Sequence, residues 1–367
     1  MSGANWLGGV YYLINLVNSF NYLSFNEDDA PHFVVFYCNA SEGFIKLFKY
    51  PNIEFVKLQE FDEKKTFLKS ILLRKNLFLT QKIKEQNIDG LYPFNNFPSA
   101  TKSNIKLISW YPDLQHKFYP EYFTSFNLWQ REYRLKCLLK NSKNLVVSSH
   151  TVKSHFDKFY DLKRLNVKVL QFVSLTEGMK QVDKMDLLKK YNIREPYFMV
   201  SNQFYKHKDH YTVLKAIDIL KREGKVFQVV LTGKMQDYRD PKHISELKAF
   251  IQNKNLAGSI RLLGVIPRDE QLSLMKFASS VIQPSLFEGW STVVEDVKSL
   301  NASIIASDIE IHKEQLTTNG LLFEASNANS LAEKMNLTLK DSKISSTDYN
   351  YLDHIKTFAS NFLELFK

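Results

Sequence analysis

The sequence is poor in cysteine and holds no long apolar run. Its two cysteines, Cys38 and Cys137, lie far apart among 367 residues and have no metal-ligand spacing around them, which argues against a disulfide framework and against a zinc site. No apolar stretch approaches the roughly 18 residues that a membrane-spanning helix needs. The first lysine or arginine is Lys46, so the charged start of a signal peptide is missing as well. We expect a protein of the reducing cytoplasm.

Charge is not scarce, but it is unevenly divided. Residues 1–180 hold 24 Lys and Arg against 16 Asp and Glu, a net charge of +8, whereas residues 181–367 hold 25 against 23, a net charge of +2. A basic surface attracts anionic lipid, phosphates or nucleic acid through a field that salt weakens. No recognised nucleic-acid-binding motif accompanies the charge, so we expect no nucleic acid partner.

Apolar residues are frequent enough to build a large core. With 44% apolar and 24% charged residues, a chain of this length is expected to form two domains. Short strand-like runs alternate with helix-like segments in both halves, which predicts βαβ units, parallel sheets and an α/β fold. The predicted strands cover residues 32–37, 53–58, 88–93, 105–110, 144–149 and 167–172 in the first half, and 197–202, 227–233, 259–264, 278–283, 303–308 and 320–325 in the second.

The segment 173–192 joins the two series of strands and has no strand signal, so we interpret it as a linker with a short helix. Two doubly wound domains joined in this way place a ligand cleft between them, because open parallel sheets bind ligands at the carboxyl ends of their strands. The residues that follow strands are therefore the candidates for a site.

A glycine-rich stretch opens the chain. Gly3, Gly8 and Gly9 precede a helix-like segment, and glycines at such a place let backbone amides approach an anion. A plain turn is an equally good reading. A doubly wound domain should also have a strand before this loop, so either a first strand is missing or the fold starts irregularly.

Two further candidates follow the strand predicted at 105–110. Asp113 and His116 are close enough in sequence to face one cleft. The aromatic residues around them are of the kind that stack on sugar rings; they are Trp110, Tyr111, Phe118 and Tyr119. The alternative is an aromatic loop that caps the core, with His116 only hydrogen-bonded.

Basic residues crowd the turn after the strand predicted at 197–202. Lys206, His207, Lys208 and His210 lie where a helix begins, and cations are unfavourable at the positive end of a helix dipole. Such a turn suggests an anionic ligand that offsets the charge. A solvated surface cluster is the alternative.

The stretch PSLFEGWSTVVED follows the strand predicted at 278–283. It delivers Glu288 and Gly289 to the cleft edge, and a helix is expected to begin near Ser291 or Thr292, where free amides suit a phosphate or a sugar hydroxyl. Asp296 lies one turn further, on the same side as Thr292. The alternative is a capped helix with solvent-facing acids.

The order of these segments resembles the retaining glycosyltransferases of family 4, also called group 1, which have the GT-B architecture. The resemblance rests on the Gly-rich loop, PDLQH, NQFYKHK, RLLGVIPRDEQLSLM, PSLFEGWSTVVED and IIASDIEIHKEQ, and is most specific in residues 197–325. The hallmark of the family is a Glu, seven residues and another Glu. Glu288 occupies the first place here, and the shorter acid Asp296 occupies the second.

The resemblance implies roles for the second half of the chain. Glu288 would contact the donor sugar near the reacting carbon, Asp296 would hold the ribose of the nucleotide, and Lys208 would bind the donor diphosphate. Gln203 stands near the place of the usual Arg, and Asn301 stands where the family has a glycine after the acidic helix, a place that asparagine tolerates nearly as well. The remaining donor-binding candidates are Gly289, Trp290, Ser291 and Thr292.

The resemblance also implies roles for the first half. His116, with Asp113 close to it in sequence, would lie beside the donor sugar, and Gly8 and Gly9 would form a flexible acceptor-side loop. Metal-dependent transferases typically offer an Asp-x-Asp, and this sequence has none. We therefore expect no metal and no other cofactor, with Lys208 and the amides near Ser291 and Thr292 meeting the charge of the leaving diphosphate.

The sequence thus predicts a GT-B protein with two Rossmann-like domains facing across a cleft. We expect an acceptor-side domain over 1–175, a donor-binding domain over 176–345 and a C-terminal helix over 346–367 that packs back on the first domain. The expected function is transfer of a sugar from a nucleotide sugar to a glycan or lipid-linked acceptor in cell-surface polysaccharide biosynthesis, such as lipopolysaccharide O-antigen or capsule. A nucleotide-sugar 2-epimerase and a non-catalytic nucleotide- or membrane-binding relic are the alternatives.

One segment suggests where such an enzyme works. Residues 63–85 interleave seven Lys or Arg with apolar side chains, a pattern that lets a helix lie on an anionic bilayer surface. An ordinary domain helix whose apolar stripe faces the core is the alternative. We expect a cytoplasmic protein with peripheral attachment to the inner face of the membrane.

Overall fold

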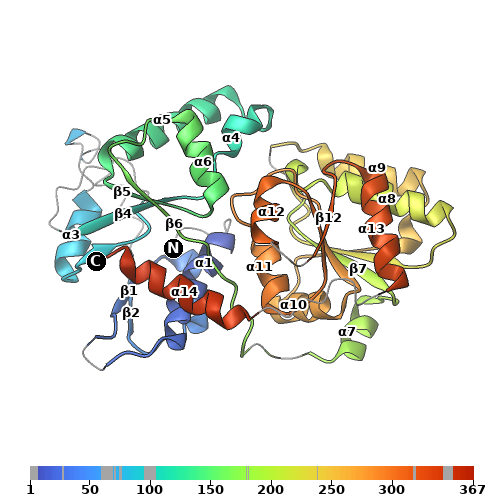
Figure 1. Ribbon diagram of the computed structural model, residues 1–367, viewed down its shortest axis with the longest axis horizontal. Helices are drawn as coiled ribbons and strands as arrows, with labels where there is room; N and C mark the ends of the chain where they lie inside the picture. Colours follow the sequence, from blue (N-terminus) through green and yellow to red (C-terminus); the bar gives the residue numbers. More distant parts are fainter. Residues whose placement is uncertain are drawn as a thin grey trace. The chain divides into compact units, whose positions relative to one another are not determined.

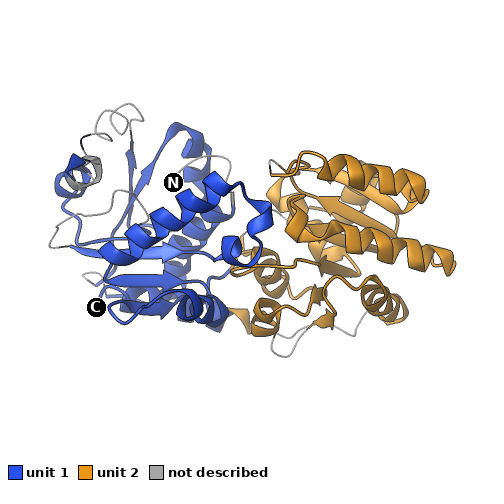
Figure 2. Ribbon diagram, turned by 90° about the horizontal axis from the view of Figure 1, so that it is seen from above, with its two compact units in different colours: residues 1–173, 352–367 blue, residues 174–351 orange. Residues whose placement is uncertain are grey.

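The computed structural model describes residues 7–26, 29–58, 69, 72–73, 77–94, 105–178, 180, 182–237, 239–316, 320–341 and 350–367. The chain divides into two compact units (Figure 2). The first unit comprises Met1–Val173 and Leu352–Lys367, and the second comprises Ser174–Tyr351.

The strands of the first unit pair in parallel. Strands β1 (Phe33–Tyr37) and β2 (Ile53–Lys57) form one ladder, in which Phe33 is opposite Ile53. A four-stranded sheet has the order β3-β4-β5-β6. Its strands are β3 (Gly90–Leu91), β4 (Lys106–Tyr111), β5 (Asn144–Val147) and β6 (Asn166–Val169).

The C-terminal helix belongs to the first unit. Helix α14 (Tyr351–Glu364, red in Figure 1) packs against α1 (Leu7–Ser19), where the ring of Phe358 meets that of Tyr12 edge-on at 6.3 Å. The prediction that the C-terminal helix returns to the first domain is confirmed. The other helices of this unit are α3 (Leu77–Glu85), α4 (Gln115–Phe118), α5 (Ser125–Asn141) and α6 (His150–Phe159).

The second unit is a six-stranded parallel sheet with the order β12-β11-β10-β7-β8-β9. This is the strand order of a Rossmann fold, in which the direction of winding reverses between the first and fourth strands. The strands are β7 (Tyr197–Ser201), β8 (Gln228–Thr232), β9 (Ile260–Gly264), β10 (Ser280–Gln283), β11 (Ile304–Ser307) and β12 (Leu321–Phe323). Four of them, β7, β8, β10 and β11, are buried along their whole length, as parallel strands covered on both faces must be.

Alternate side chains of this sheet build a core on each face. On one face Phe198, Val229 and Ile282 pack against α8 (His210–Arg222), α9 (His243–Asn253) and α13 (Ala328–Lys340). On the other face Met199 and Val230 pack against helices that lie on the opposite side in Figure 1. These are α7 (Lys184–Tyr191), α10 (Arg268–Phe277) and α11 (Thr292–Ser299), near the short α12 (Glu310–Gln315).

Every predicted strand has its counterpart in the structure, and the α/β prediction with parallel sheets is confirmed. The predicted linker 173–192 contains the expected short helix, α7, and the side chain of Asp183 caps its N-terminus. Asn301, expected to accept the left-handed conformation after the acidic helix, has a φ of 49°.

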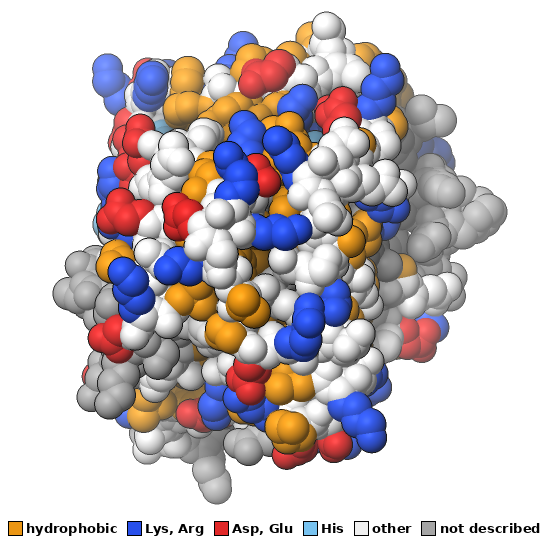
Figure 3. All heavy atoms as spheres, turned by 90° about the vertical axis from the view of Figure 1, so that its right-hand side faces the viewer, with side chains coloured by type: hydrophobic (Ala, Val, Ile, Leu, Met, Phe, Trp, Pro, Cys, Tyr) orange, Lys and Arg blue, Asp and Glu red, His pale blue; other side chains and the backbone are white. Residues whose placement is uncertain are grey.

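Charge is mixed on the face of the protein that Figure 3 shows, where Lys and Arg side chains alternate with acids and apolar groups. Among the residues that the structure describes, no helix combines the length and apolar character needed to cross a bilayer.

Candidate functional site

Polar side chains converge where β7 and β10 of the second unit end. Gln283, the last residue of β10, is fully buried, and its side-chain oxygen accepts a hydrogen bond of 2.7 Å from Nδ2 of Asn202, the residue after β7. Its Nε2 lies 2.9 Å from Oε1 of Glu288 and 3.0 Å from Oγ of Ser291. Gln283 therefore ties the end of the sheet to the loop that carries the predicted acid.

The close approach of two chain segments at this sheet edge requires a glycine. Gly233 follows β8 with a φ of 129°, and a Cβ added there would lie 2.1 Å from the backbone oxygen of Asn202. No side chain fits in that space, so Gly233 sets the path of the Asn202 turn.

Glu288 and Lys208 form an ion pair. Nζ of Lys208 donates to Oε1 of Glu288, and the two side chains are only 16% and 11% exposed. Lys208 ends a short 3-10 helix (Lys206–Lys208) that follows β7. The structure thus joins two candidates that are 80 residues apart in sequence, and in this state the cation is matched by an acid of the protein itself.

The sequence predicted four cations at this turn, and the prediction is wrong for two of them, the histidines. His207 and His210 are buried, and burial lowers the pKa of His207 well below its usual value and that of His210 to about 3. Both rings are therefore neutral. Asp209, which caps α8 through a 3.2 Å hydrogen bond from the amide of Thr212, supplies the negative charge at the helix start.

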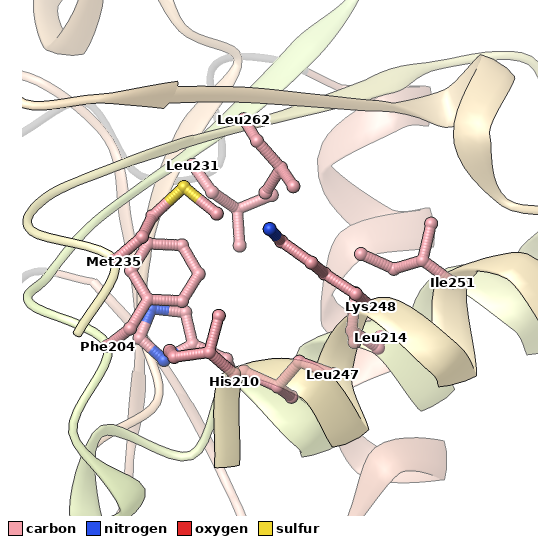
Figure 4. Close-up of a pocket in the computed structure, with 10 residues that line it drawn as sticks. Phe204, His210, Leu214, Leu231, Met235, Leu247, Lys248, Ile251 and Leu262 are labelled. Atoms are coloured by element: carbon pink, nitrogen blue, oxygen red, sulfur yellow. The ribbon is translucent and has the colours of Figure 1, made fainter. Parts of the chain in front are cut away.

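The ring of His210 belongs to an apolar hollow in the second unit. It stacks on Phe204 with the ring centres 4.2 Å apart. Figure 4 shows Met235, Leu231 and Leu262 around the same space, with the ammonium of Lys248 at its edge. A histidine in this position packs against the core and does not take part in the polar cluster around Glu288.

Helix α12 holds the loop that carries Glu288. The side-chain amide of Gln315 pairs with both backbone groups of Ser291: its Oε1 accepts from the amide at 2.9 Å and its Nε2 donates to the carbonyl at 3.1 Å. At the other end of the loop, Oγ of Ser307 donates to the carbonyl of Ser285, and Nδ1 of His312 lies 3.0 Å from that Oγ.

The fixed position of Ser291 corrects one expectation. Its amide, predicted to be free for a ligand, is occupied by Gln315, and its Oγ caps α11 by accepting from the amide of Val294. The helix does begin at Thr292, as predicted. Gly289 and Trp290 are buried, and Thr292 is half-buried.

The two acids of α11 are buried, so the alternative of solvent-facing acids is excluded. Glu295 pairs with Lys298 at 3.0 Å and accepts from the hydroxyl of Tyr351 at 2.7 Å. Burial, followed by the nearby Glu295, raises the pKa of Tyr351 well above its usual value. Nε2 of Gln315 also donates to Glu295 at 3.0 Å. These contacts of Glu295 fix the position of α11.

Asp296, the predicted ribose ligand, is engaged by the protein itself. Its side chain is 1% exposed, and Arg268, the first residue of α10, binds both of its oxygens, with Nη1 at 2.8 Å from Oδ2. Oγ of Ser174 donates to the same carboxylate. Gln203, which stands near the place of the family's Arg, is half-buried between Asn202 and Phe204.

In the first unit, His116 and Asp113 have separate partners. His116 lies on α4, is buried, and has its Nε2 3.7 Å from Oε2 of Glu132. Burial lowers its pKa, and Arg131 and Lys117 lower it further. Asp113 instead accepts a hydrogen bond of 2.9 Å from the amide of Gln115.

Two expectations for the first unit are wrong. Gly8 and Gly9 do not form a loop, because both lie in the first turn of α1. Trp110 is not a platform for a sugar: it is 3% exposed and stacks on Tyr12 with the ring centres 4.8 Å apart. For Trp110 the core-packing alternative is correct.

Arg268 and Gln315 are contacts of the site that the sequence did not reveal. Arg268 stands 28 residues before Asp296 and Gln315 stands 24 residues after Ser291. The signal available was the family resemblance, because both lie in segments that carry it, RLLGVIPRDEQLSLM and IIASDIEIHKEQ. Within the described part of the chain, no group of three or more His, Cys, Asp or Glu side chains is arranged to hold a metal ion.

Residues 183–351 match the family described as glycosyl transferases group 1. The match lies within the second unit and contains Lys208, Glu288 and Asp296. No curated protein sequence matches the chain.

Solved structures resemble the whole chain. HepE from Anabaena, determined in complex with UDP and glucose, has a TM-score of 0.68 at 14% identity, over 99% of this chain and 97% of that one. A glycosyltransferase from Rickettsia africae has a TM-score of 0.62 at 16% identity, over 100% and 93%. Sucrose-phosphate synthase from Thermosynechococcus elongatus has 0.60 at 17%, over 87% and 80%. The chain has the GT-B fold.

Proposed function

We propose that this protein is a retaining glycosyltransferase of family 4, which moves a sugar from a nucleotide sugar to a glycan or lipid-linked acceptor. The observation that carries the proposal is the pairing of Glu288 with Lys208 at the carboxyl edge of a Rossmann-type sheet. An acid for a sugar and a cation for a diphosphate are then side by side, in the part of the chain that matches glycosyl transferases group 1.

The donor diphosphate would take the place of Glu288 as the partner of Lys208. The amide of Thr292, at the positive end of α11, would add a second contact to the phosphates. Because three similar solved structures of HepE contain UDP or UDP-glucose, uridine nucleotides are the first donors to test. Asp296 is 1% exposed, so a ribose would reach its carboxylate only if neighbouring side chains moved aside.

The transfer breaks the bond between the sugar's anomeric carbon and the diphosphate oxygen, and forms one from that carbon to an acceptor hydroxyl. In a same-face reaction the leaving phosphate takes the proton of the acceptor, and the configuration is retained. Glu288 would orient the sugar, and Lys208 would stabilise the growing charge of the leaving group. His116 and Asp113 are the candidates for contacts from the first unit.

We further propose that the reaction needs no metal, because the sequence contains no Asp-x-Asp and Lys208 can meet the leaving charge. Activity should then persist in EDTA. Loss of activity in the chelator, with recovery on adding Mg²⁺ or Mn²⁺, would disprove this part.

The acceptor we propose is a growing cell-surface polysaccharide, such as an O-antigen or capsule, at the cytoplasmic face of the membrane. The excess of basic residues in the first half of the chain supports a membrane-proximal acceptor.

A thermal-shift screen of nucleotide sugars tests the proposal first, because a ligand that binds the folded state raises the melting temperature. The nucleotide sugar that stabilises the protein is then incubated with glycan and lipid-linked acceptors, and the anomeric configuration of the product is determined by NMR. Release of the nucleoside diphosphate together with an α-linked product from an α-linked donor supports the proposal. A nucleotide sugar epimerised at C2 would indicate an epimerase instead.

Two observations favour a non-catalytic role. Gln203 stands where the family has a positively charged residue, and the carboxylate of Asp296 is already bound by Arg268. Tight binding of a nucleotide without turnover of any sugar donor would favour this second function.

A further inference from the structure

Helix α5 of the first unit carries an exposed aromatic stripe. Phe126, Trp129 and Tyr133 are 65%, 61% and 47% exposed, and their spacing of three and four residues places them on one face of the helix. The ring of Trp129 lies parallel to that of Tyr133, with the centres 5.6 Å apart, and 6.1 Å from the centre of Phe126. The opposite face buries Leu135 and Leu138.

An exposed row of aromatic rings is unusual in a soluble domain. Large apolar side chains on a surface are common singly, but a contiguous group of them marks a contact with something else. Trp and Tyr are the residues preferred where a protein meets the headgroup region of a bilayer, because they join an apolar ring to a polar group.

The charges of α5 are almost all positive. The helix has four cations, Arg131, Arg134, Lys136 and Lys140, and one acid, Glu132. Glu132 is turned toward the protein, where it pairs with Lys117 at 2.8 Å and accepts from the hydroxyl of Tyr160 at 2.8 Å. Among the described residues, Arg134 and Lys140 have no ion-pair partner. The exposed side of α5 thus combines aromatic rings with a positive field.

We propose that this face of α5 docks the protein on an anionic lipid bilayer, with Trp129 and its two neighbours in the headgroup region and the basic residues against lipid phosphates. An amphipathic helix with a basic polar face binds membranes in this way. The inference goes beyond the sugar transfer proposed above and does not depend on it, because it concerns a different unit of the chain and a lipid surface.

The same observations argue against a dimer. In a symmetric dimer formed through α5, the cations of one copy would face those of the other, and like charges repel.

The surface differs from the segment 63–85, for which sequence alone suggested membrane attachment. Eleven of its 23 residues, 63–68, 70–71 and 74–76, lie outside the described residues. Leu72 and Leu73 within it are described and are 85% and 61% exposed, so these two side chains do not face the core. They offer a second surface against which α5 can be compared.

The test measures binding to vesicles without any nucleotide sugar or acceptor. We expect the full chain to sediment with phosphatidylglycerol-containing vesicles in low salt, to be released by high salt, and not to bind pure phosphatidylcholine. Replacement of Phe126, Trp129 and Tyr133 by Ser should lower the partition coefficient about tenfold, and Arg134→Glu with Lys140→Glu should lower it by a similar factor. The control is Val226→Ser with Val265→Ser, two exposed apolar positions in the second unit.

A second readout places Trp129 at the lipid. Its fluorescence should be quenched by brominated lipids when measured in a Trp6→Phe background, which is needed because Trp6 lies outside the described residues. Adding Trp129→Phe should preserve binding and remove most of that quenching, because the remaining Trp110 and Trp290 are buried. Circular dichroism confirms that each variant is folded.

Several outcomes would overturn the proposal. One is equal sedimentation with neutral and anionic vesicles, or with neither. Another is binding that survives the α5 changes but disappears in Leu72→Ser with Leu73→Ser, which would move docking to the segment 63–85. A change in Trp129 fluorescence on adding an anionic glycan or nucleic acid, and none on adding vesicles, would identify a different partner. A failed vesicle assay leaves the sugar-transfer proposal intact, because the nucleotide-sugar screen is independent of it.

Discussion

Lys208 and Glu288 neutralise each other in the second unit, and Glu288 is also held by Gln283 at 2.9 Å. Both contacts fall on the same oxygen, Oε1 of Glu288, so a diphosphate that binds Nζ of Lys208, as proposed, would compete with that oxygen for the ammonium. Substitution of Lys208 or Glu288 therefore leaves the charge of the other unbalanced.

Glu288→Gln should abolish sugar transfer without weakening nucleotide binding. The amide retains the size of the side chain but cannot balance the charge of Lys208, which becomes more available to a diphosphate. We expect kcat/KM to fall more than tenfold, a loss of over ~1.4 kcal/mol in transition-state stabilisation, and the calorimetric affinity for the nucleoside diphosphate to stay equal or rise. A variant with more than a tenth of the parent activity would show that Glu288 is not at the reacting sugar.

Lys208→Ala should weaken binding of the nucleoside diphosphate by roughly ten- to a hundredfold, because a hydrogen bond to a charged group contributes about 1.5–3 kcal/mol. Lys206→Ala is the matched control. Lys206 lies in the same 3-10 helix, but its side chain is 53% exposed and pairs with Asp240 at 3.3 Å. Isothermal titration of both variants decides the assignment, since equal affinities would place the phosphates elsewhere.

The sheets could be predicted from the sequence because their strands are local signals. Val229, Val230 and Leu231 of β8 lie in a continuous apolar run between a polar segment and Gly233, and burial on both faces demands such a run. The Lys208–Glu288 pair could be expected for the same reason, since both residues follow strands of one sheet. Resemblance to a known family supplied their chemistry.

The rest of the site depends on contacts between segments distant in sequence. A histidine beside lysines has the same pattern whether its ring is solvated or, like His210, stacked on Phe204 in the core. Gln315 is one polar residue of a short helix, and nothing in its neighbours indicates that it pairs with the backbone of Ser291. Such pairings follow from the packing of α12 against the loop, which only the three-dimensional fold defines.

Gln315→Leu should lower kcat more than it lowers nucleotide affinity. The change leaves the amide and carbonyl of Ser291 without their buried partner, at a cost of about 1–3 kcal/mol for an unsatisfied group, and loosens the loop that carries Glu288. Steady-state kinetics should show a fall in kcat of about tenfold, and urea denaturation should show reduced stability. Lys313→Ala, at a side chain 57% exposed on the same helix, should change neither. A kcat equal to that of the parent would show that the clamp has no part in positioning Glu288.

Asp296 and Arg268 should show strong energetic coupling. Arg268→Gln leaves a buried carboxylate with Ser174 as a remaining partner, and breaking a buried pair by removing one member is costly. In a double-mutant cycle with Asp296→Asn, measured by urea denaturation, we expect a coupling energy of about 1–3 kcal/mol. Additive losses would show that the pair is not formed in solution. A large loss of nucleotide affinity in Asp296→Asn alone, with stability unchanged, would instead favour a direct contact of Asp296 with the ribose.

The buried His210 should make the protein less stable in mild acid. Burial, with smaller contributions from His243 and Lys208, lowers its pKa from 6.5 to about 3. Between these two values the unfolded chain binds a proton that the folded chain does not, so the free energy of unfolding falls as the pH falls, by up to about 1.4 kcal/mol per pH unit. Well above pH 6.5 the imidazole is neutral in both states, and the group contributes no pH dependence.

His210→Phe isolates this effect, because it keeps a ring to stack on Phe204 and removes the titrating group. Neither ring nitrogen of His210 has a hydrogen-bond partner among the described residues, so the substitution sacrifices no hydrogen bond there. We expect equal or higher stability at pH 7 and a smaller loss of stability on going to pH 5, measured by urea denaturation at a series of pH values. The carboxylates titrate alike in both proteins, and His312, whose pKa burial lowers to about 4, adds the same slope to each. Parallel stability curves for parent and variant would show that His210 is protonated equally in the folded and unfolded states, which would contradict its place in the apolar hollow.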